Sequence, residues 1–225
     1  MAEQLIFDLP HRQALGREDF LVADSNRNAI SAIDTWPDWG AHIALICGPQ
    51  GTGKSHILNV WRLKTQAVFL AADDLHEDKI ESTLHIPAAH FALDDLDHIL
   101  CEPLHVQNGL FHLLNAIKNR GGTFLATSRT VPKELPVTVP DLQSRLKSAV
   151  VFNIEAPDDD LLFALWVKQF HDRQLKIEPD VIKFLMLRCE RSFAALGKTV
   201  EKIDAASLKE KRRITLPFIK KVLDI

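Results

Sequence analysis

The sequence has few cysteines, no long hydrophobic run and no compositionally biased segment. Three cysteines in 225 residues, without metal-type spacing, exclude a disulfide framework and suit a reducing cytoplasm. No apolar run reaches the roughly 18 residues that a membrane span needs. The N-terminus lacks a basic segment followed by an apolar one, so we expect neither a signal peptide nor a membrane partner.

An excess of charge of one sign is also lacking. Lys and Arg number 27 against 30 Asp and Glu, a net charge of −3. Basic residues gather near the C-terminus, at Lys209, Lys211, Arg212, Arg213, Lys220 and Lys221. They form either a weak anion-binding surface or, as the simpler reading, a solvated helix face. The ten histidines have none of the spacings of a zinc site, so we predict no metal there.

What the sequence does contain is an alternation of short apolar runs with helical patterns. The expected buried strands are 42–47, 67–71, 90–93, 123–127 and 149–154. The alternation predicts an α/β fold, with a parallel sheet flanked by helices. Beyond Ile154 every apolar pattern has helical period. We therefore expect an N-terminal extension at 1–18, an α/β nucleotide-binding domain at 19–156 and a small all-helical domain at 157–225.

A phosphate-binding loop follows the first predicted strand. Residues 48–55 match G-x-x-x-x-G-K-S, with a strand before them and a helix after them, which argues against a chance match. Glycines let backbone N–H groups turn toward phosphates, and Lys54 is expected at the β- and γ-phosphates with the Ser55 hydroxyl on Mg²⁺. The residues expected at the nucleotide are Pro49, Gln50, Gly51, Thr52, Gly53, Lys54, Ser55 and His56.

Two further strand ends supply candidate catalytic groups. Asp94 and Asp95 follow the run 90–93, where a P-loop protein holds Mg²⁺ through a carboxylate, here Asp94. Asp95 is placed to polarise an attacking water. The alternative is that both residues only begin a solvated loop. Ser128, at the end of the next strand, is a candidate to contact the γ-phosphate or the water.

These motifs, in this order and followed by a helical lid, resemble the AAA+ family and, within it, the DnaA initiator group. Residues 19–26 are similar to the segment that cradles adenine in that group, which implies contacts from Leu21 and Val22. Residues 141–146 are similar to its arginine-finger motif, which implies that Arg145 faces a neighbour's γ-phosphate. A surface arginine on a short helix is the other reading.

The lid departs from the pattern of this group at one position. Related proteins place a nucleotide-sensing arginine where this chain has Ala194, and Arg191, three residues earlier on the same helix face, is the candidate replacement. Without such a contact the lid does not couple to the γ-phosphate, which would be consistent with bound ADP. Whether ADP or ATP is bound at rest, the intrinsic ATPase activity and the oligomeric state, a homodimer included, stay open.

The N-terminal residues resemble a second known motif. Residues 4–9 are similar to the hexapeptide that binds the sliding clamp of DNA polymerase III, an extended peptide with apolar anchors. The implied clamp-binding residues are Gln4, Leu5, Phe7 and Leu9. A segment packed on its own domain is the alternative. Together with the absence of a duplex-reading domain after the lid, this opening makes the chain resemble the Hda group of DnaA-related regulators.

The resemblance implies a negative regulator of replication initiation. Such a protein binds adenine nucleotide with Mg²⁺, binds the DNA-loaded clamp and promotes hydrolysis of DnaA-bound ATP through Arg145. The chemistry then occurs in the partner's site, DNA is contacted only through the clamp, and the protein acts in the cytoplasm at the replisome. The alternatives are a self-acting AAA+ ATPase of the helicase-loader or initiator type, and a clamp-bound DNA adaptor with a silent P-loop.

Overall fold

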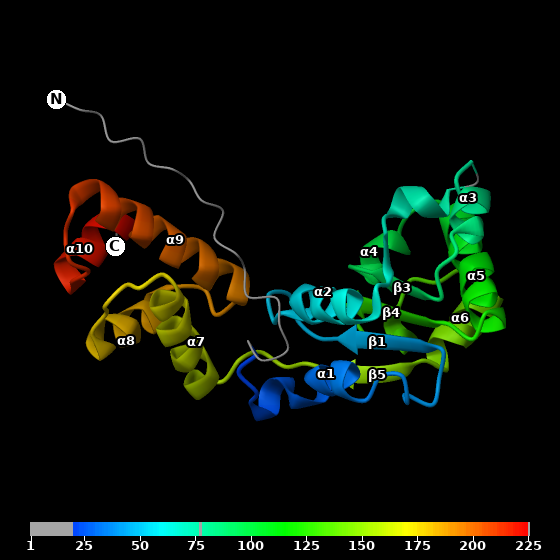
Figure 1. Ribbon diagram of the computed structural model, residues 1–225, viewed down its shortest axis with the longest axis horizontal. Helices are drawn as coiled ribbons and strands as arrows, with labels where there is room; N and C mark the ends of the chain where they lie inside the picture. Colours follow the sequence, from blue (N-terminus) through cyan, green and yellow to red (C-terminus); the bar gives the residue numbers. More distant parts are fainter. Residues whose placement is uncertain (1–19, 77, 225) are drawn as a thin grey trace.

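The computed structural model describes residues 20–76 and 78–224. An α/β domain and an all-helical domain lie side by side, the second drawn from yellow to red in Figure 1. The predicted clamp peptide at 4–9 lies outside the described residues, so its prediction is carried forward without a structural account.

The α/β domain is built on a five-stranded parallel sheet in the order β2-β3-β4-β1-β5. The strands are β1 (Ile43–Cys47), β2 (Val68–Leu70), β3 (His90–Leu93), β4 (Thr123–Ser128) and β5 (Val150–Asn153). Each predicted strand is present, with ends that agree to within a residue. Because all strands are parallel, the loops after β1, β3 and β4 meet at one edge of the sheet.

Helices cover both faces of this sheet because its strands are apolar on both sides. Ala44 and Ile46 share one core with α1 (Asp24–Asp34) and α2 (Lys54–Thr65). Leu45 lies between them in sequence and faces the opposite core, with α5 (Leu104–Asn119) and α6 (Pro140–Lys147). This alternation follows from the two-residue period of a strand and confirms the predicted fold class.

Short helical segments complete the connections between strands. They are η2 (Ala72–Leu75), α3 (Ile80–His85), α4 (Leu96–Ile99) and η3 (Pro132–Glu134). Of these, α4 matters most for the site, because it starts immediately after Asp95 and packs against β4.

Four helices form the second domain around their own core. They are α7 (Asp159–Asp172), α8 (Pro179–Arg188), α9 (Phe193–Glu210) and α10 (Leu216–Leu223). Side-chain caps begin α7 and α9: the Asp158 carboxylate accepts the Leu161 N–H at 2.7 Å, and the Ser192 hydroxyl accepts the Ala195 N–H at 3.1 Å. The Ser192 cap fixes where α9 starts, directly above the phosphate loop.

The segment before α1 joins the two domains. Phe20 packs against the core under α1 and α2, whereas Leu21 and Ala23 pack against the helical core. Asn26, 4% exposed, holds this segment, because its amide accepts the Ala23 N–H at 2.9 Å and donates to the Leu21 carbonyl at 2.8 Å. The Glu155 N–H donates to the Ser25 carbonyl at 2.8 Å, which fastens the start of α1 to the β5–α7 connection.

The core of the helical domain gives a stability prediction. We expect Leu185→Ala to lower the free energy of unfolding by about 2–5 kcal/mol, because Leu185 is fully buried on α8 and its loss leaves a cavity. Leu187→Ala, two residues on and 82% exposed, should cost less than about 0.5 kcal/mol. Urea unfolding followed by circular dichroism measures both, and equal losses would contradict the packing described here.

Candidate nucleotide-binding site

The phosphate loop is shaped by glycine at two positions. Gly51 and Gly53 have φ of +78° and +96°, in the left-handed region that glycine adopts without strain, and α2 begins immediately after Gly53. Gly51 is also limited by space, because an added Cβ would lie 2.4 Å from the Cβ of Ser192 in the helical domain. The Phe193 N–H donates to the Gly51 carbonyl at 2.9 Å, so the loop and the start of α9 are in direct contact.

Lys54 lies inside this loop and is 5% exposed. Its ammonium donates to the carbonyls of Gly48 and Pro49, each at 2.8 Å. Burial lowers the pKa of Lys54 below its usual value, and neighbouring carboxylates, Asp95 foremost, oppose this shift. The site therefore combines a buried cation with carboxylates, which is the charge arrangement that a magnesium–phosphate group needs.

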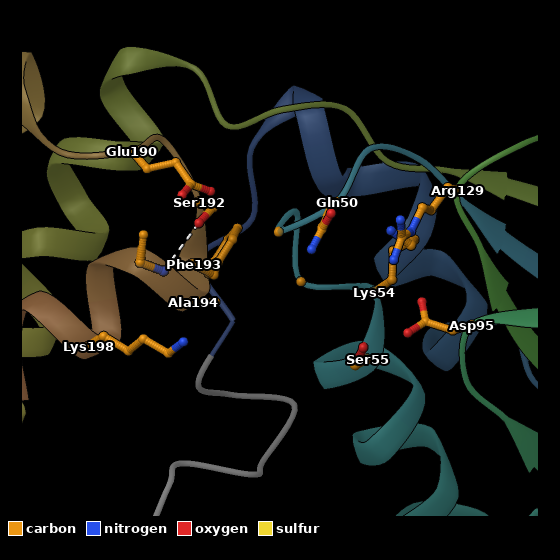
Figure 2. A pocket seen from close by; sticks show the side chains of 13 residues that line it. Gln50, Lys54, Ser55, Asp95, Arg129, Glu190, Ser192, Phe193, Ala194 and Lys198 are labelled. Carbon is orange, nitrogen blue, oxygen red and sulfur yellow. Dashed lines mark hydrogen bonds between the residues drawn. The ribbon is translucent and has the colours of Figure 1, made fainter. Parts of the chain in front are cut away.

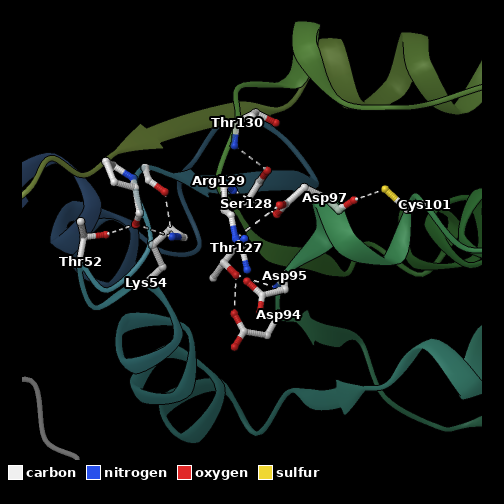
Figure 3. A network of polar contacts seen from close by, with 12 residues as sticks. Thr52, Lys54, Asp94, Asp95, Asp97, Cys101, Thr127, Ser128, Arg129 and Thr130 are labelled. Carbon is white, nitrogen blue, oxygen red and sulfur yellow. Dashed lines mark hydrogen bonds and ion pairs between the residues drawn. The ribbon is translucent and has the colours of Figure 1, made fainter. Parts of the chain in front are cut away.

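A network of polar contacts organises the carboxylates at the end of β3 (Figure 3). The Thr127 hydroxyl, fully buried, donates to the Asp94 carboxylate and accepts the Asp95 N–H at 2.9 Å. Asp95 has φ of +50°, a left-handed conformation that aspartate tolerates better than most residues. This turn directs Asp95 into the cavity beside Lys54 and Ser55 (Figure 2). Asp94 instead accepts the Thr127 hydroxyl (Figure 3).

The predicted catalytic residue Ser128 lies behind this network. It is fully buried, its hydroxyl accepts the Thr130 N–H at 3.2 Å, and its carbonyl accepts the Gly48 N–H at 3.2 Å. Ser128 thus ties β4 to the phosphate loop. The hydroxyl that reaches the carboxylates is that of Thr127, which precedes it.

A cavity of about 470 Å³ lies between the loop and α9 (Figure 2). Asp95 lines it together with five of the predicted nucleotide residues, which are Gln50, Gly51, Gly53, Lys54 and Ser55, the last also predicted for Mg²⁺. Arg129, Glu190, Ser192 and Phe193 complete much of its wall. The Ser55 hydroxyl and the Asp95 carboxylate line the cavity and are hard oxygen donors of the kind that Mg²⁺ prefers. Asp94, the carboxylate predicted for Mg²⁺, lines neither this cavity nor the next and accepts the Thr127 hydroxyl.

A second cavity, of about 450 Å³, adjoins the first and shares Gly53, Phe193, Ala194 and Lys198 with it. Leu21 and His56 line this second cavity, as does Phe20, whose ring centroid is 4.7 Å from that of His56. The two cavities together have the volume of a small-molecule site. Val22, Pro49 and Thr52 line neither of them; Val22 is 47% exposed, and the Thr52 hydroxyl donates to the Pro49 carbonyl at 3.0 Å.

The helical domain contributes a different cation from the one expected. Ala194 lines both cavities, whereas the Arg191 guanidinium pairs with the Asp159 carboxylate and lines neither. Lys198, one turn beyond Ala194 on α9, lines both. The sequence reasoning missed Lys198 and Arg129; the signals available were a basic residue four positions after Ala194 and another directly after the end of β4.

Arg145 lies away from both cavities. On α6, its guanidinium donates to the amide oxygen of Asn115 and stands 5.3 Å from the ring centroid of Phe111, both on α5. A charged hydrogen bond and a cation–π contact thus hold this side chain on the surface of its own domain.

The described residues contain neither a cluster of metal-binding side chains nor a membrane-spanning helix. Over 20–76 and 78–224, no three His, Cys, Asp or Glu side chains come together as a metal-binding group. In the same part of the chain, no helix has both the length and the apolarity required to cross a membrane.

Comparisons with known proteins concern the helical domain and the fold. Residues 158–223 match the family model described as Hda, lid domain. The fold is similar to that of domain III of the replication initiation protein DnaA from Thermotoga maritima, with a TM-score of 0.82 and 18% identity over 96% of this chain and 98% of that one. The helical domain of this chain therefore resembles the Hda lid, and the fold of the whole chain is similar to that of DnaA domain III. The resemblance and fold class predicted from the motifs are confirmed.

Two further matches cover most of the length of this chain. AMPPCP-bound DnaA from Aquifex aeolicus has a TM-score of 0.73 and 19% identity, over 88% of this chain and 68% of that one. An uncharacterized protein of Haemophilus influenzae is 28% identical over 218 residues, 93% of this chain and 91% of that protein.

The Thr127 network gives a prediction for the site. We expect Thr127→Val to lower the free energy of unfolding by about 1–3 kcal/mol, because it leaves the Asp94 carboxylate and the Asp95 N–H, whose hydrogen bonds to Thr127 are partly buried, without their shared partner. It should also weaken the Mg²⁺ dependence of nucleotide binding. Thr35→Val, an exposed change at the residue that follows α1, is the matched control for unfolding. A stability equal to that of the control would contradict the role given to Thr127.

Proposed function

We propose that this protein is a negative regulator of replication initiation that promotes hydrolysis of DnaA-bound ATP. The observation that carries the proposal is the position of Arg145, which lies outside its own cavities and is held on the domain surface by Asn115 and Phe111. An arginine in this position would not contact a nucleotide bound in the cavities of its own chain. It is available to a neighbouring subunit, and the similarity of the chain to DnaA and to the Hda lid supports DnaA as the proposed partner.

Hydrolysis of ATP in the DnaA site would benefit from a guanidinium that another protein supplies. Phosphoryl transfer spreads charge over the oxygens of the γ-phosphate, and a fixed planar cation stabilises that charge. The two contacts on α5 restrict the conformations of Arg145 before any partner binds. Less side-chain entropy is then lost when the finger enters the partner's site.

Its own cavity is proposed to hold an adenine nucleotide with Mg²⁺. The Lys54 ammonium, the Ser55 hydroxyl and the carboxylate of Asp95 line the cavity that the loop forms with α9, and one structural neighbour is DnaA with AMPPCP bound. Because Ala194 faces the cavity and Arg191 is paired with Asp159, the arginine expected from the lid is engaged elsewhere. We infer that resting ADP serves to hold the lid in place.

The clamp is proposed as the second partner, on the strength of the pattern at residues 4–9. DNA is then contacted only through the clamp, which places the protein at the replisome in the cytoplasm. A homodimer in which Arg145 meets the cavity of a second copy is a further proposed assembly of the same contact.

A self-acting ATPase is the second candidate function. The observation that favours it is that Lys54, Ser55, Asp95 and Arg129 line one cavity, so the chain holds the groups for hydrolysis in its own site. The two functions differ in whose ATP is consumed.

The test of the first function is hydrolysis of ATP bound to DnaA, with clamp-loaded DNA, in the presence and absence of this protein. We expect stimulation that Arg145→Ala reduces by on the order of 10³-fold or to background, in line with arginine fingers elsewhere. Lys147→Ala, exposed on the same helix, is the control and should keep the stimulation. No stimulation by the unaltered protein, with ATP turnover by this chain alone, would replace the proposal with the self-acting ATPase.

The tether gives a separate prediction. Gln4→Ala combined with Leu5→Ala should abolish binding to the clamp, measured by surface plasmon resonance, because it removes the hydrogen bond and one apolar anchor of the peptide. Stimulation of DnaA should fall in the presence of the clamp, while the fold and nucleotide binding are unchanged. Full clamp binding by this variant would show that residues 4–9 are not the tether.

A further inference from the structure

Arg129 is a cation of the nucleotide cavity that no motif of the sequence identified. It follows the last residue of β4 and lines the cavity next to Lys54 and Asp95, toward which its side chain points (Figure 2). It lines only the first cavity and not the one that contains Phe20, Leu21 and His56. Arg129 therefore stands at the end of the site that is remote from those rings.

The position of Arg129 is set by one carboxylate. Asp97, in the first turn of α4, accepts the backbone N–H of Arg129 at 3.1 Å, and its second oxygen lies 3.7 Å from Nε. The contact to Nε is at the stem side of the guanidinium, so the terminal nitrogens extend beyond Asp97 into the cavity. The Asp97 side chain is 18% exposed and that of Arg129 48% exposed, which makes Asp97 the more fixed of the two.

Two cations lie close together at this end of the cavity. The charge of Arg129 contributes to lowering the pKa of Lys54, so the two groups act on each other electrostatically. Two cations held near one another repel, and an anion that lies near both offsets this repulsion. Asp95 supplies part of that compensation, and a phosphate group would supply the rest.

The order of the two cavities and Arg129 indicates which phosphate of a nucleotide Arg129 would contact. The loop and the N-terminus of α2 would hold the phosphates nearest Lys54, and the second cavity, lined by the rings of Phe20 and His56, lies on the side of the helical domain. A nucleotide with its base in that second cavity points its last phosphate toward β4, where Arg129 stands.

We propose that Arg129 binds the terminal phosphate of a nucleoside triphosphate in this chain's own site, with Asp97 as its positioning residue. Arg129 then makes the site distinguish a triphosphate from a diphosphate. The helical domain does not supply this contact, because α9 has an alanine at position 194. This inference rests on the proposed nucleotide binding and adds to it a residue that determines specificity.

The test compares two nucleotides on the full chain. Affinities for ADP and for AMPPCP, both with Mg²⁺, are measured by calorimetry for the unaltered protein and for Arg129→Ala. We expect Arg129→Ala to weaken AMPPCP by about 10- to 100-fold, the effect of losing a charged hydrogen bond, and to change ADP by less than about 3-fold. Arg120→Ala, an exposed arginine at the end of α5 and outside both cavities, should change neither.

Asp97→Asn tests the positioning role. It keeps the size of the side chain and an oxygen for the Arg129 N–H but removes the charge that faces Nε, so we expect a smaller loss that is again confined to AMPPCP. Thermal unfolding of each variant, without nucleotide, shows whether the fold is intact. Arg129→Lys should recover part of the AMPPCP affinity, since the charge is restored without the planar fork.

Two results would overturn the inference. Equal losses for ADP and AMPPCP in Arg129→Ala would mean that the residue contributes only general positive charge. Unchanged affinity for both would mean that it does not contact phosphate. Failure of the unaltered protein to bind either nucleotide is a different result, because it would overturn the proposed nucleotide site itself, and this inference with it.

Discussion

The contact between the phosphate loop and the start of α9 is the constraint on which the site depends. The Phe193 N–H donates to the Gly51 carbonyl, and Ser192 packs where any side chain on Gly51 would stand. The same Ser192 hydroxyl caps α9. The conformation of the loop, the start of the helix and the width of the cavity are therefore set together, and a change at any of the three changes the others.

In the polar network at the sheet edge, single side chains likewise hold more than one group. The Thr127 hydroxyl serves Asp94 and the backbone of Asp95, and Asp97, a few residues on, holds Arg129. These contacts join β3, α4 and β4 around Lys54. The carboxylates are thereby held at fixed positions, while Asp95 and Arg129 keep their charged ends in the cavity.

The fold and the phosphate loop were predictable because their signals are local. The strand 90–93 is a continuous apolar run, and the loop after Cys47 carries its glycines and lysine in fixed order. The roles of Thr127 and Ser128 were not separable, since both end β4 and only the packed structure shows which hydroxyl reaches the carboxylates. Arg129 and Lys198 enter the cavity through tertiary packing, which no local pattern encodes.

The segment at residues 20–23 has a consequence for how the molecule comes apart. Phe20 belongs to one hydrophobic core, and Leu21 and Ala23 to the other, within three peptide bonds. Loss of the helical domain would expose apolar surface of a segment that Asn26 also anchors to α1. We therefore expect the two domains to be thermodynamically linked, so that a ligand that contacts both raises the melting temperature of both.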